Sequence, residues 1–286
     1  MGEANSPTDY IAIITDMHLE PLDGRNPQRR GIVTSPEVRT RNLETVYQDL
    51  ASGESPEAVL FGGDNANQSV SRPDYRRYAH SFMKRFPAPV YALPGNHDVG
   101  STAGWPHHDP DAMSEACLAF RQDWDDWWLL EAAGFRILGI NTQIFGSVLP
   151  EAEAQCRWLR EHLSRPRQEH LLTVVFGHTP PFLKSADDNF RDGSEQMCLQ
   201  PEARRPLLDV LFSSPPDLLI TAHAHRHWIR QLPDWTWMGL PTTAVGQKDM
   251  PTVPSHNLPE GDDHVGWIAL SRDGGGWRVR FHRLDA

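Results

Sequence analysis

Five short apolar segments of the chain each run directly into an acidic, amide or imidazole side chain, and this pattern constrains the fold more than any other feature. The segments alternate with helical patterns, which is typical of an α/β fold. In α/β sheets, ligands gather beyond the carboxyl ends of strands, so polar groups far apart in sequence can converge there. The segments and the polar residues after them are YIAIIT (Asp16, His18), AVLFGG (Asp64), VYALPG (Asn96, His97, Asp98), LLTVVFG (His178) and DLLITA (His223, His225).

The residue types at these strand ends suit a pair of metal ions. Carboxylates and neutral imidazoles bind Mn, Fe or Zn, and one carboxylate can bridge two ions about 3.5–4 Å apart in two-metal hydrolases. Side chains at i and i+2 of an extended segment point the same way, so Asp16 with His18, and His223 with His225, are each expected to hold an ion from one side. If Asp16 and Asp64 are the only charged ligands, two divalent ions keep a formal charge of about +2, which attracts phosphate.

The polar residues form five motifs that, taken in order, resemble those of the calcineurin-like metallophosphoesterases. The chain reads DMH at 16–18, GGDN at 62–65, GNHD at 95–98, GH at 177–178 and AHAH at 222–225. The resemblance implies an α/β fold in which two mixed sheets are flanked by helices as a four-layer α/β/β/α sandwich. It also implies a single metallophosphoesterase domain over residues 1–286, with a candidate lid at 99–126.

The same resemblance implies a ligand set for two divalent or mixed-valence metal ions, with Mn, Fe or Zn as the expected metals. One ion would be bound by Asp16, His18 and His225, the other by Asn96, His178 and His223, and Asp64 would bridge them. One residue departs from the family pattern: Ala222 stands where the family has glycine. Its added methyl group could shift the second metal or crowd the site.

The resemblance further implies hydrolysis of a phosphate ester by a metal-bound hydroxide. Asn96 and His97 would contact the phosphate, His97 would protonate the leaving oxygen, and Asp98 would orient His97. Looser segments outside the metal motifs are similar to small single-domain calcineurin-like phosphatases and favour a phosphomonoesterase. These are GNHDVGSTAG, FRQDWDDWW, NTQIF, AEAQCRWLREHL and GQKDM. A cyclic-nucleotide or other phosphodiesterase is the alternative, because it shares the metal set. A non-catalytic metal-binding scaffold ranks lower, because every ligand and His97 are present.

Composition restricts the binding partners and the cellular compartment expected for this protein. The net charge of −11 argues against a nucleic-acid groove. The first ten residues lack the apolar run of a signal peptide, and no segment approaches the roughly 18 apolar residues of a membrane span. Cys117, Cys156 and Cys198 are too scattered for a disulfide framework or a thiolate zinc site. Composition therefore favours a cytoplasmic protein with no membrane partner, and the resemblance adds a small phosphate ester or a phosphoprotein as the expected substrate.

Local signals predict several elements and leave other residues open. A helix is expected from the N-cap Ser35 and Pro36 to a stop at Gly53. Further helices are expected after Pro73 and over 111–124, 151–163 and 202–212, and glycines mark a C-terminal hairpin. The open cases are His107 and His108 (loop or substrate contact), Asn65, Asn67 and Gln68 (turn or cleft lining), Arg226 and His227 (flanking the ligands), and Phe182 with the SADDNF loop (candidates for substrate selection).

Overall fold

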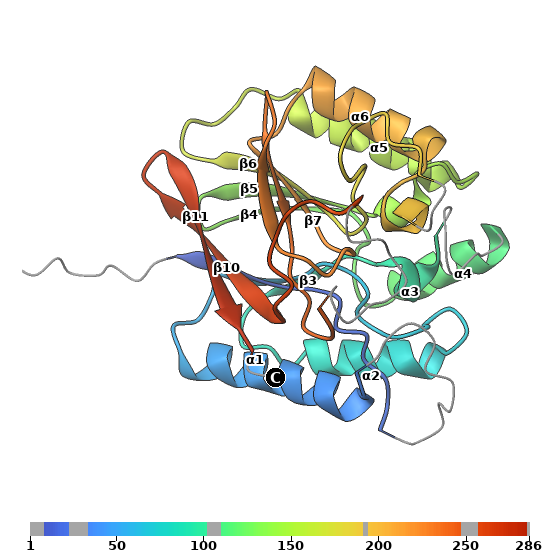
Figure 1. Ribbon diagram of the computed structural model, residues 1–286, viewed down its shortest axis with the longest axis vertical. Helices are drawn as coiled ribbons and strands as arrows, with labels where there is room; N and C mark the ends of the chain where they lie inside the picture. Colours follow the sequence, from blue (N-terminus) through green and yellow to red (C-terminus); the bar gives the residue numbers. More distant parts are fainter. Residues whose placement is uncertain (1–8, 23–33, 102–109, 191–193, 247–256, 285–286) are drawn as a thin grey trace, which may run out of the picture.

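Two β-sheets lie at the centre of the structure and face each other (Figure 1). The computed structural model describes residues 9–22, 34–101, 110–190, 194–246 and 257–284. The strands are β1 (Tyr10–Ile14), β2 (Ala58–Phe61), β3 (Val90–Ala92), β4 (Trp128–Ala132), β5 (Phe135–Ile140), β6 (Leu172–Gly177), β7 (Leu218–Thr221), β8 (Trp228–Gln231), β9 (Thr236–Gly239), β10 (Gly266–Asp273) and β11 (Gly276–Arg283). The first sheet has the order β11-β10-β1-β2-β3 and the second has the order β4-β5-β6-β7-β9-β8.

Both sheets are mixed, and their parallel strands decide where the polar strand ends meet. In the first sheet β1, β2 and β3 run parallel, while β10 pairs antiparallel with β1. In the second sheet β5, β6 and β7 run parallel, with β4 antiparallel at one edge. Because neighbouring parallel strands end at the same edge of a sheet, the motifs that follow β1, β2 and β3 lie side by side, as do those that follow β6 and β7.

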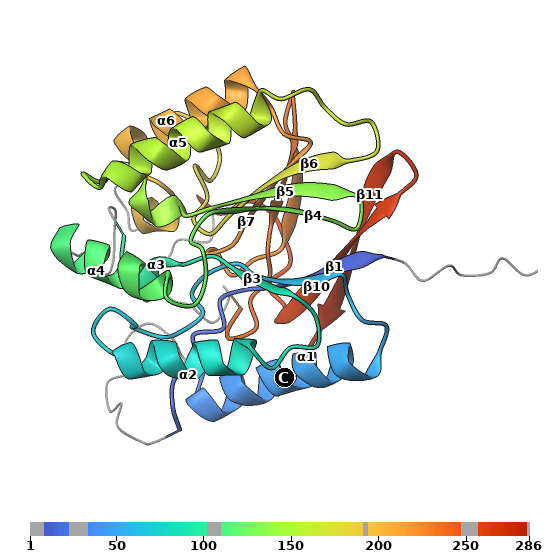
Figure 2. The same cartoon turned by 180° about the vertical axis from the view of Figure 1, so that it is seen from behind.

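Helices cover the outer face of each sheet (Figures 1 and 2). The first sheet is covered by α1 (Pro36–Ser52) and α2 (Pro73–Met83), and the second by α5 (Pro150–Leu163) and α6 (Pro201–Ser213). The shorter elements are α3 (Asn96–Val99), α4 (Pro110–Phe120), η1 (Thr142–Ile144) and η2 (Ser194–Met197). The four-layer α/β/β/α sandwich is therefore confirmed. Within the described ranges, no helix combines the length and the apolar character that crossing a membrane requires.

Successive side chains along a strand point to opposite faces of the sheet and so form the apolar layers on its two sides. Along β1, Ile11 and Ile13 face the apolar layer between the sheets, whereas Ala12 and Ile14 face the layer under α1 and α2. This follows from the two-residue period of a strand, and burying one such large apolar side chain contributes about 1.5–3 kcal/mol. The layer between the sheets draws on strands of both, so it fixes the two polar edges relative to each other.

The local signals placed most elements correctly. Helix α1 begins after Ser35, whose hydroxyl accepts a hydrogen bond from the Val38 amide at 3.4 Å, and ends before Gly53. Helix α4 ends at Phe120, four residues before the expected end, and the chain then turns so that Arg121 binds the Asp126 carboxylate at 2.8 and 3.0 Å. The hairpin of β4 and β5 was not predicted, because its turn places an alanine in a left-handed conformation that usually calls for Asn, Asp or Gly.

Candidate metal centre

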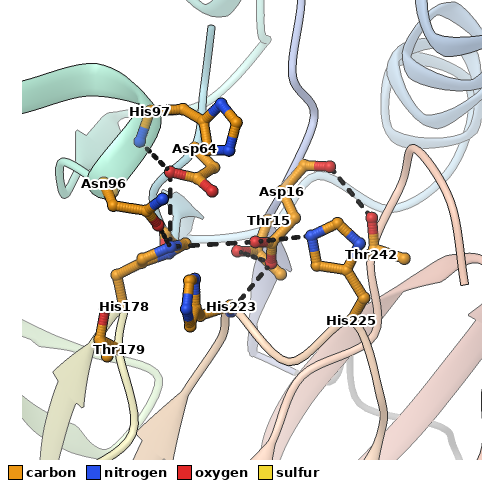
Figure 3. A network of polar contacts seen from close by, with 12 residues as sticks. Thr15, Asp16, Asp64, Asn96, His97, His178, Thr179, His223, His225 and Thr242 are labelled. Atoms are coloured by element: carbon orange, nitrogen blue, oxygen red, sulfur yellow. Dashed lines mark hydrogen bonds and ion pairs between the residues drawn. The ribbon is translucent and has the colours of Figure 1, made fainter. Parts of the chain in front are cut away.

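The five polar strand ends converge on one buried cluster at the edge where the two sheets meet (Figure 3). The first sheet contributes residues after β1, β2 and β3, and the second contributes residues after β6 and β7. In Figure 3 the labelled carboxylate, amide and imidazole groups point toward one another from both sheets. The structure therefore brings together all seven expected ligands: Asp16, His18, Asp64, Asn96, His178, His223 and His225.

One half of the cluster consists of Asp16, His18 and His225. Asp16 Oδ1 lies 3.2 Å from His225 Nε2, and His18 Nε2 lies 3.2 Å from the same nitrogen. Each of the three side chains offers one donor atom within 4.8 Å of the others. This is the set expected for the first metal ion.

The other half consists of Asn96, His178 and His223 around Asp64. His178 Nε2 lies 3.4 Å from Asp64 Oδ1 and 3.3 Å from Asn96 Oδ1. Donor atoms of Asp64, His178 and His223 lie within 4.8 Å of one another. The second carboxylate oxygen of Asp64 lies 3.7 Å from His18 Nε2, so Asp64 stands between the two halves, as a bridging ligand must.

Backbone carbonyls fix which ring nitrogen of three histidines can bind a metal. His178 Nδ1 donates to Gly62 O, His225 Nδ1 to Val245 O and His223 Nε2 to Gln196 O, each at 2.8 Å. A carbonyl can only accept, so in each neutral ring the other nitrogen carries a lone pair. That nitrogen is Nε2 in His178 and His225 and Nδ1 in His223. Metal-binding histidines are typically held in this way.

The ligand positions carry most of the backbone strain of the described chain. Seven non-glycine residues with positive φ occur within the described ranges, and five of them are expected ligands: Asp16 (51°), His18 (46°), Asp64 (50°), His223 (67°) and His225 (50°). A left-handed backbone is unfavourable for such residues and persists where the surrounding structure enforces it, commonly at functional sites. The expected period-two geometry of an extended segment is therefore wrong: both pairs lie beyond their strands, and their side chains converge through left-handed turns.

Electrostatic fields within the cluster are strong. Burial raises the pKa of Asp64, but His178 and His97 outweigh it and hold the pKa well below its ordinary value. Burial lowers the pKa of His178, but the Asp64 and Asp16 carboxylates raise it to about 9. Burial and the neighbouring His178 lower the pKa of His223 to about 4. The two carboxylates thus favour a positive charge among them, and a divalent ion would replace a proton there.

The donor set fits a pair of metal ions. Asp16 Oδ1 is buried and accepts no hydrogen bond from the described residues, and the lone-pair nitrogens of the histidines face carboxylate oxygens. Two carboxylates, one amide oxygen and four imidazoles are donors that Mn, Fe and Zn accept. Cations at the centre would satisfy these groups together.

Residues 10–227 match the profile of the calcineurin-like phosphoesterases. The chain belongs to this family. It is a phosphoric ester hydrolase whose family uses a dinuclear metal centre, and its own Asp and His clusters could hold metal ions.

Two curated relatives point to different substrates. A probable cyclic nucleotide phosphodiesterase of Synechococcus is 27% identical over 285 residues, which cover 96% of this chain and 92% of the relative. The human serine/threonine-protein phosphatase CPPED1 is 30% identical over 143 residues, which cover 49% of this chain and 42% of the relative. The match to the phosphatase thus spans less than half of either protein.

Two solved structures share the fold. A purple acid phosphatase from yellow lupin has a TM-score of 0.65 at 13% identity and covers 96% of this chain and 51% of its own. A dimetal phosphatase from Danio rerio has a TM-score of 0.55 at 12% identity and covers 93% of both chains. At these identities the likeness shows the fold alone.

Within the GNHD motif of this phosphoesterase, Asp98 has a different contact from the expected one. Its carboxylate accepts hydrogen bonds from the backbone amides of Gly95 (2.9 Å), Asn65 (3.0 Å) and Ala66 (3.0 Å) and makes none to the His97 ring among the described residues. Burial and the Asp64 carboxylate raise the pKa of Asp98 to about 7. Asp98 therefore ties the β2 and β3 loops together and orients His97 only through the backbone.

The His97 side chain is nearly buried and lies against the first half of the cluster. Its ring meets the His18 ring edge-on, with centroids 4.6 Å apart, and its backbone amide donates to Asp64 Oδ1 at 2.8 Å. Burial lowers the pKa of His97 despite the nearby Asp64 carboxylate. A ring nitrogen of His97 also lies within 4.8 Å of donor atoms of His18 and Asp64, so the geometry alone would let His97 bind a metal ion, whereas the family pattern assigns it to the phosphate.

Other residues singled out from the sequence are structural. Phe182, a candidate for substrate selection, is buried against Trp237, with ring centroids 5.0 Å apart. Asp188 of the SADDNF loop accepts three backbone amides and stabilises its own turn. The Ala222 methyl is buried in the layer between the sheets.

The remaining candidates flank the centre or lie elsewhere. Asn65 binds Leu93 O, which supports the turn interpretation, and Arg226 is held by Asp263 at 2.6 and 3.2 Å. His107, His108 and the part of the candidate lid at 102–109 lie outside the described residues.

Two threonines and two glycines near the ligands were missed by sequence reasoning. Thr15 donates to Asp16 Oδ2 at 2.8 Å and Thr242 donates to Asp16 O at 3.0 Å. A Cβ at Gly95 would lie 2.1 Å from Asp64 Oδ1, and one at Gly63 would lie 2.5 Å from His178 Nδ1. Thr15 adjoins a motif and the glycines belong to motifs, but Thr242 is 226 positions from Asp16 and carried no local signal.

Proposed function

We propose that this phosphoesterase is a dinuclear metal-dependent phosphomonoesterase. The observation that carries the proposal is the convergence of seven donor side chains, in which backbone carbonyls leave the lone-pair Nε2 of His178 and of His225 facing carboxylate oxygens. In this proposal Asp16, His18 and His225 bind one ion, Asn96, His178 and His223 bind the other, and Asp64 bridges them. Mn, Fe and Zn are the metals that suit these donors.

The bound ions would supply positive charge to the phosphate and lower the pKa of a water molecule toward neutrality. The chain's own residues hold and orient the substrate. Asn96 and His97 sit together at the start of α3, so the Asn96 amide and the His97 imidazole can approach the same phosphate group. Asp98 keeps this turn in place through its bonds to backbone amides of two loops.

His97 is proposed as the acid that protonates the leaving oxygen. A departing alkoxide is a strong base and needs a proton, which a histidine can supply. Burial favours the neutral ring, but the negative charge of a bound phosphate beside it favours the protonated form. The backbone contact to Asp64 fixes the ring relative to the ligand that both ions would share.

The monoester preference rests on the segments that resemble small calcineurin-like phosphatases, and the match to human CPPED1 supports it. The second candidate is a phosphodiesterase, favoured by the relative named for cyclic nucleotides, whose match spans almost both full chains. The same ligand cluster suits both reactions, because the difference lies in the groups around the phosphorus.

A side-by-side assay tests this choice. Manganese-loaded protein would be assayed on p-nitrophenyl phosphate and on bis-p-nitrophenyl phosphate, with Asp64→Ala as a background control. We expect faster turnover of the monoester, which would direct the search to phosphoproteins and small phosphate monoesters. Faster turnover of the diester would reject the monoesterase and make cyclic nucleotides the next substrates. No turnover of either would reject both.

We propose further that residues 1–286 act as a single catalytic domain, with residues 99–126 as a lid, in a reducing compartment such as the cytoplasm. The shared apolar layer between the sheets supports the single domain. Three free, buried cysteines support the compartment, since an oxidising one would favour disulfides.

A further inference from the structure

A buried arginine stands directly behind the first half of the metal centre. Arg39 of α1 is 3% exposed, and its Nη1 donates to the backbone carbonyl of His18 at 2.7 Å. Its Nη2 pairs with the Glu20 carboxylate, which is itself 5% exposed. The other oxygen of Glu20 accepts from Asn67 Nδ2 at 3.2 Å. The guanidinium therefore links α1 to the loop after β1, and Asn67 extends the link to the loop after β2.

Both backbone groups of His18 are held by partners outside its own loop. The His18 amide donates to Asp64 O at 2.9 Å, while the His18 carbonyl accepts from Arg39. The residue between these two bonds has φ of +46°, a left-handed conformation that is uncommon for residues other than glycine and is stabilised here by both bonds. Its ring is thereby aimed so that Nε2 lies 3.2 Å from His225 Nε2.

A charged group is a costly way to fill this position. Removing an arginine and a glutamate from water carries a large penalty, and apolar side chains of similar size often stabilise a fold as well or better. A guanidinium instead gives a short, charge-assisted hydrogen bond in a fixed planar geometry. Such a group restrains the direction of the His18 carbonyl more tightly than packing alone.

We propose that Arg39 is a positioning residue that sets the affinity of the Asp16–His18–His225 set for its metal ion. The inference rests on the ligand assignment proposed above. Arg39 acts through the His18 backbone, and Glu20 with Asn67 holds the guanidinium in place. Groups that orient metal ligands typically change metal affinity by about 10–100-fold when they are mutated. The half formed by Asn96, His178 and His223 has no contact with Arg39 among the described residues and keeps its affinity.

Manganese titration of chelator-stripped protein tests the proposal. Wild-type protein, Arg39→Met and the control Arg136→Met would be titrated by calorimetry and followed by electron paramagnetic resonance. Arg136 is a matched control, because it is 6% exposed, lies in β5 of the second sheet and bonds His162 of α5 at 3.2 Å. We expect two equivalents in wild type and the control. In Arg39→Met one equivalent should bind about 10–100-fold more weakly, and the signal of coupled manganese pairs should give way to that of isolated ions at limiting metal.

Two further variants guard against a folding defect. Arg39→Lys keeps a positive charge that can reach the His18 carbonyl but cannot form the planar fork to both partners, so an intermediate loss at one site is expected. Glu20→Gln leaves the arginine without its counter-charge and should weaken the same site. Circular dichroism and the thermal midpoint would establish that each variant is folded before titration.

The outcomes separate this inference from the proposed function. If wild type binds two equivalents and folded Arg39 and Glu20 variants bind both with unchanged affinity, the positioning role is overturned. An equal weakening of both sites together with a lowered thermal midpoint would also overturn it, because Arg39 would then act on the fold as a whole. If wild type itself binds no manganese, the ligand assignment fails, and the inference fails with it.

Discussion

Replacing His97 by alanine should abolish turnover of alkyl phosphates while leaving the metal centre intact. The backbone contacts of residue 97 do not depend on its side chain: its amide donates to Asp64 Oδ1 at 2.8 Å, and its carbonyl accepts from Ser69 at 2.8 Å. The ring is not among the seven expected ligands. The substitution therefore removes the acid and keeps the frame that holds Asp64.

The expected magnitude follows from the proposed proton transfer. A positioned general acid contributes about 10²–10⁴-fold to the rate, or about 3–5 kcal/mol of the activation barrier. The loss should depend on the leaving group, because an alkoxide needs a proton and nitrophenolate is a weak enough base to leave without one. On O-phosphoserine we expect the full loss in kcat/KM. On p-nitrophenyl phosphate the loss in kcat/KM should be smaller by a factor of about ten or more.

The assay compares the two substrates for wild type, His97→Ala and the control His170→Ala, with metal content measured on each preparation. His170 is exposed and lies outside the cluster, so its loss should change neither rate nor metal content. Equal losses on both substrates would refute the acid role. Loss of bound metal in His97→Ala would refute it as well, since the ring would then be a ligand.

Three further predictions concern the metal centre and the fold around it. Asp64→Ala should lose most of its bound metal and its activity, because the carboxylate lies between both halves, 3.4 Å from His178 and 3.7 Å from His18; two equivalents at wild-type affinity, measured by elemental analysis after dialysis, would contradict the bridging role. Removing the metal ions with a chelator should lower the midpoint of thermal unfolding by about 5–10 °C per site. A metal ion at about 100 times its Kd stabilises the folded protein by about 2.7 kcal/mol, and each change of about 1 kcal/mol shifts the midpoint of a protein of this size by about 2–4 °C. A thermal unfolding curve that EDTA leaves unchanged would count against a metal centre. Burial raises the pKa of Asp123, but hydrogen bonds from His80 and Lys84 outweigh burial and hold the pKa below its ordinary 3.8. The ionised carboxylate therefore stabilises the fold above pH 3.8, and this stabilisation is lost as the pH falls through the lowered pKa. Asp123→Asn should flatten the acid side of the stability profile measured by urea unfolding, and an unchanged slope would exclude this linkage.

Much of the architecture could be predicted because its signals are local. The cap and stop of α1 are a serine, a proline and a glycine next to the helix they bound, and these residues act through bonds to their immediate neighbours. The metal motifs are short sequence strings, and their order carried the resemblance from which the ligand set was expected. The hairpin of β4 and β5 escaped prediction, because its turn depends on a left-handed alanine that no composition rule favours.

The functional contacts were less predictable where partners are distant. Asp98 was expected to orient His97, and in the folded chain its carboxylate accepts hydrogen bonds from amides of the neighbouring loop, 32 and 33 positions away. Phe182 was a candidate for substrate selection, and in the folded chain it packs in the core against Trp237 of the second sheet. For both Asp98 and Phe182, the residues they contact are distant in sequence and come close only when the strands and helices pack together.

The sequence by itself determined which side chains follow each strand, and hence which types of donor atom gather at the candidate centre. The tertiary structure alone decided the backbone conformation of those residues, the ring nitrogens that backbone carbonyls occupy and the contacts of Arg39. These properties depend on hydrogen bonds between segments far apart in the chain, such as His225 to Val245 and Thr242 to Asp16. A left-handed ligand residue is unfavourable in isolation, and it persists here because two sheets packed against each other supply the partners that hold it.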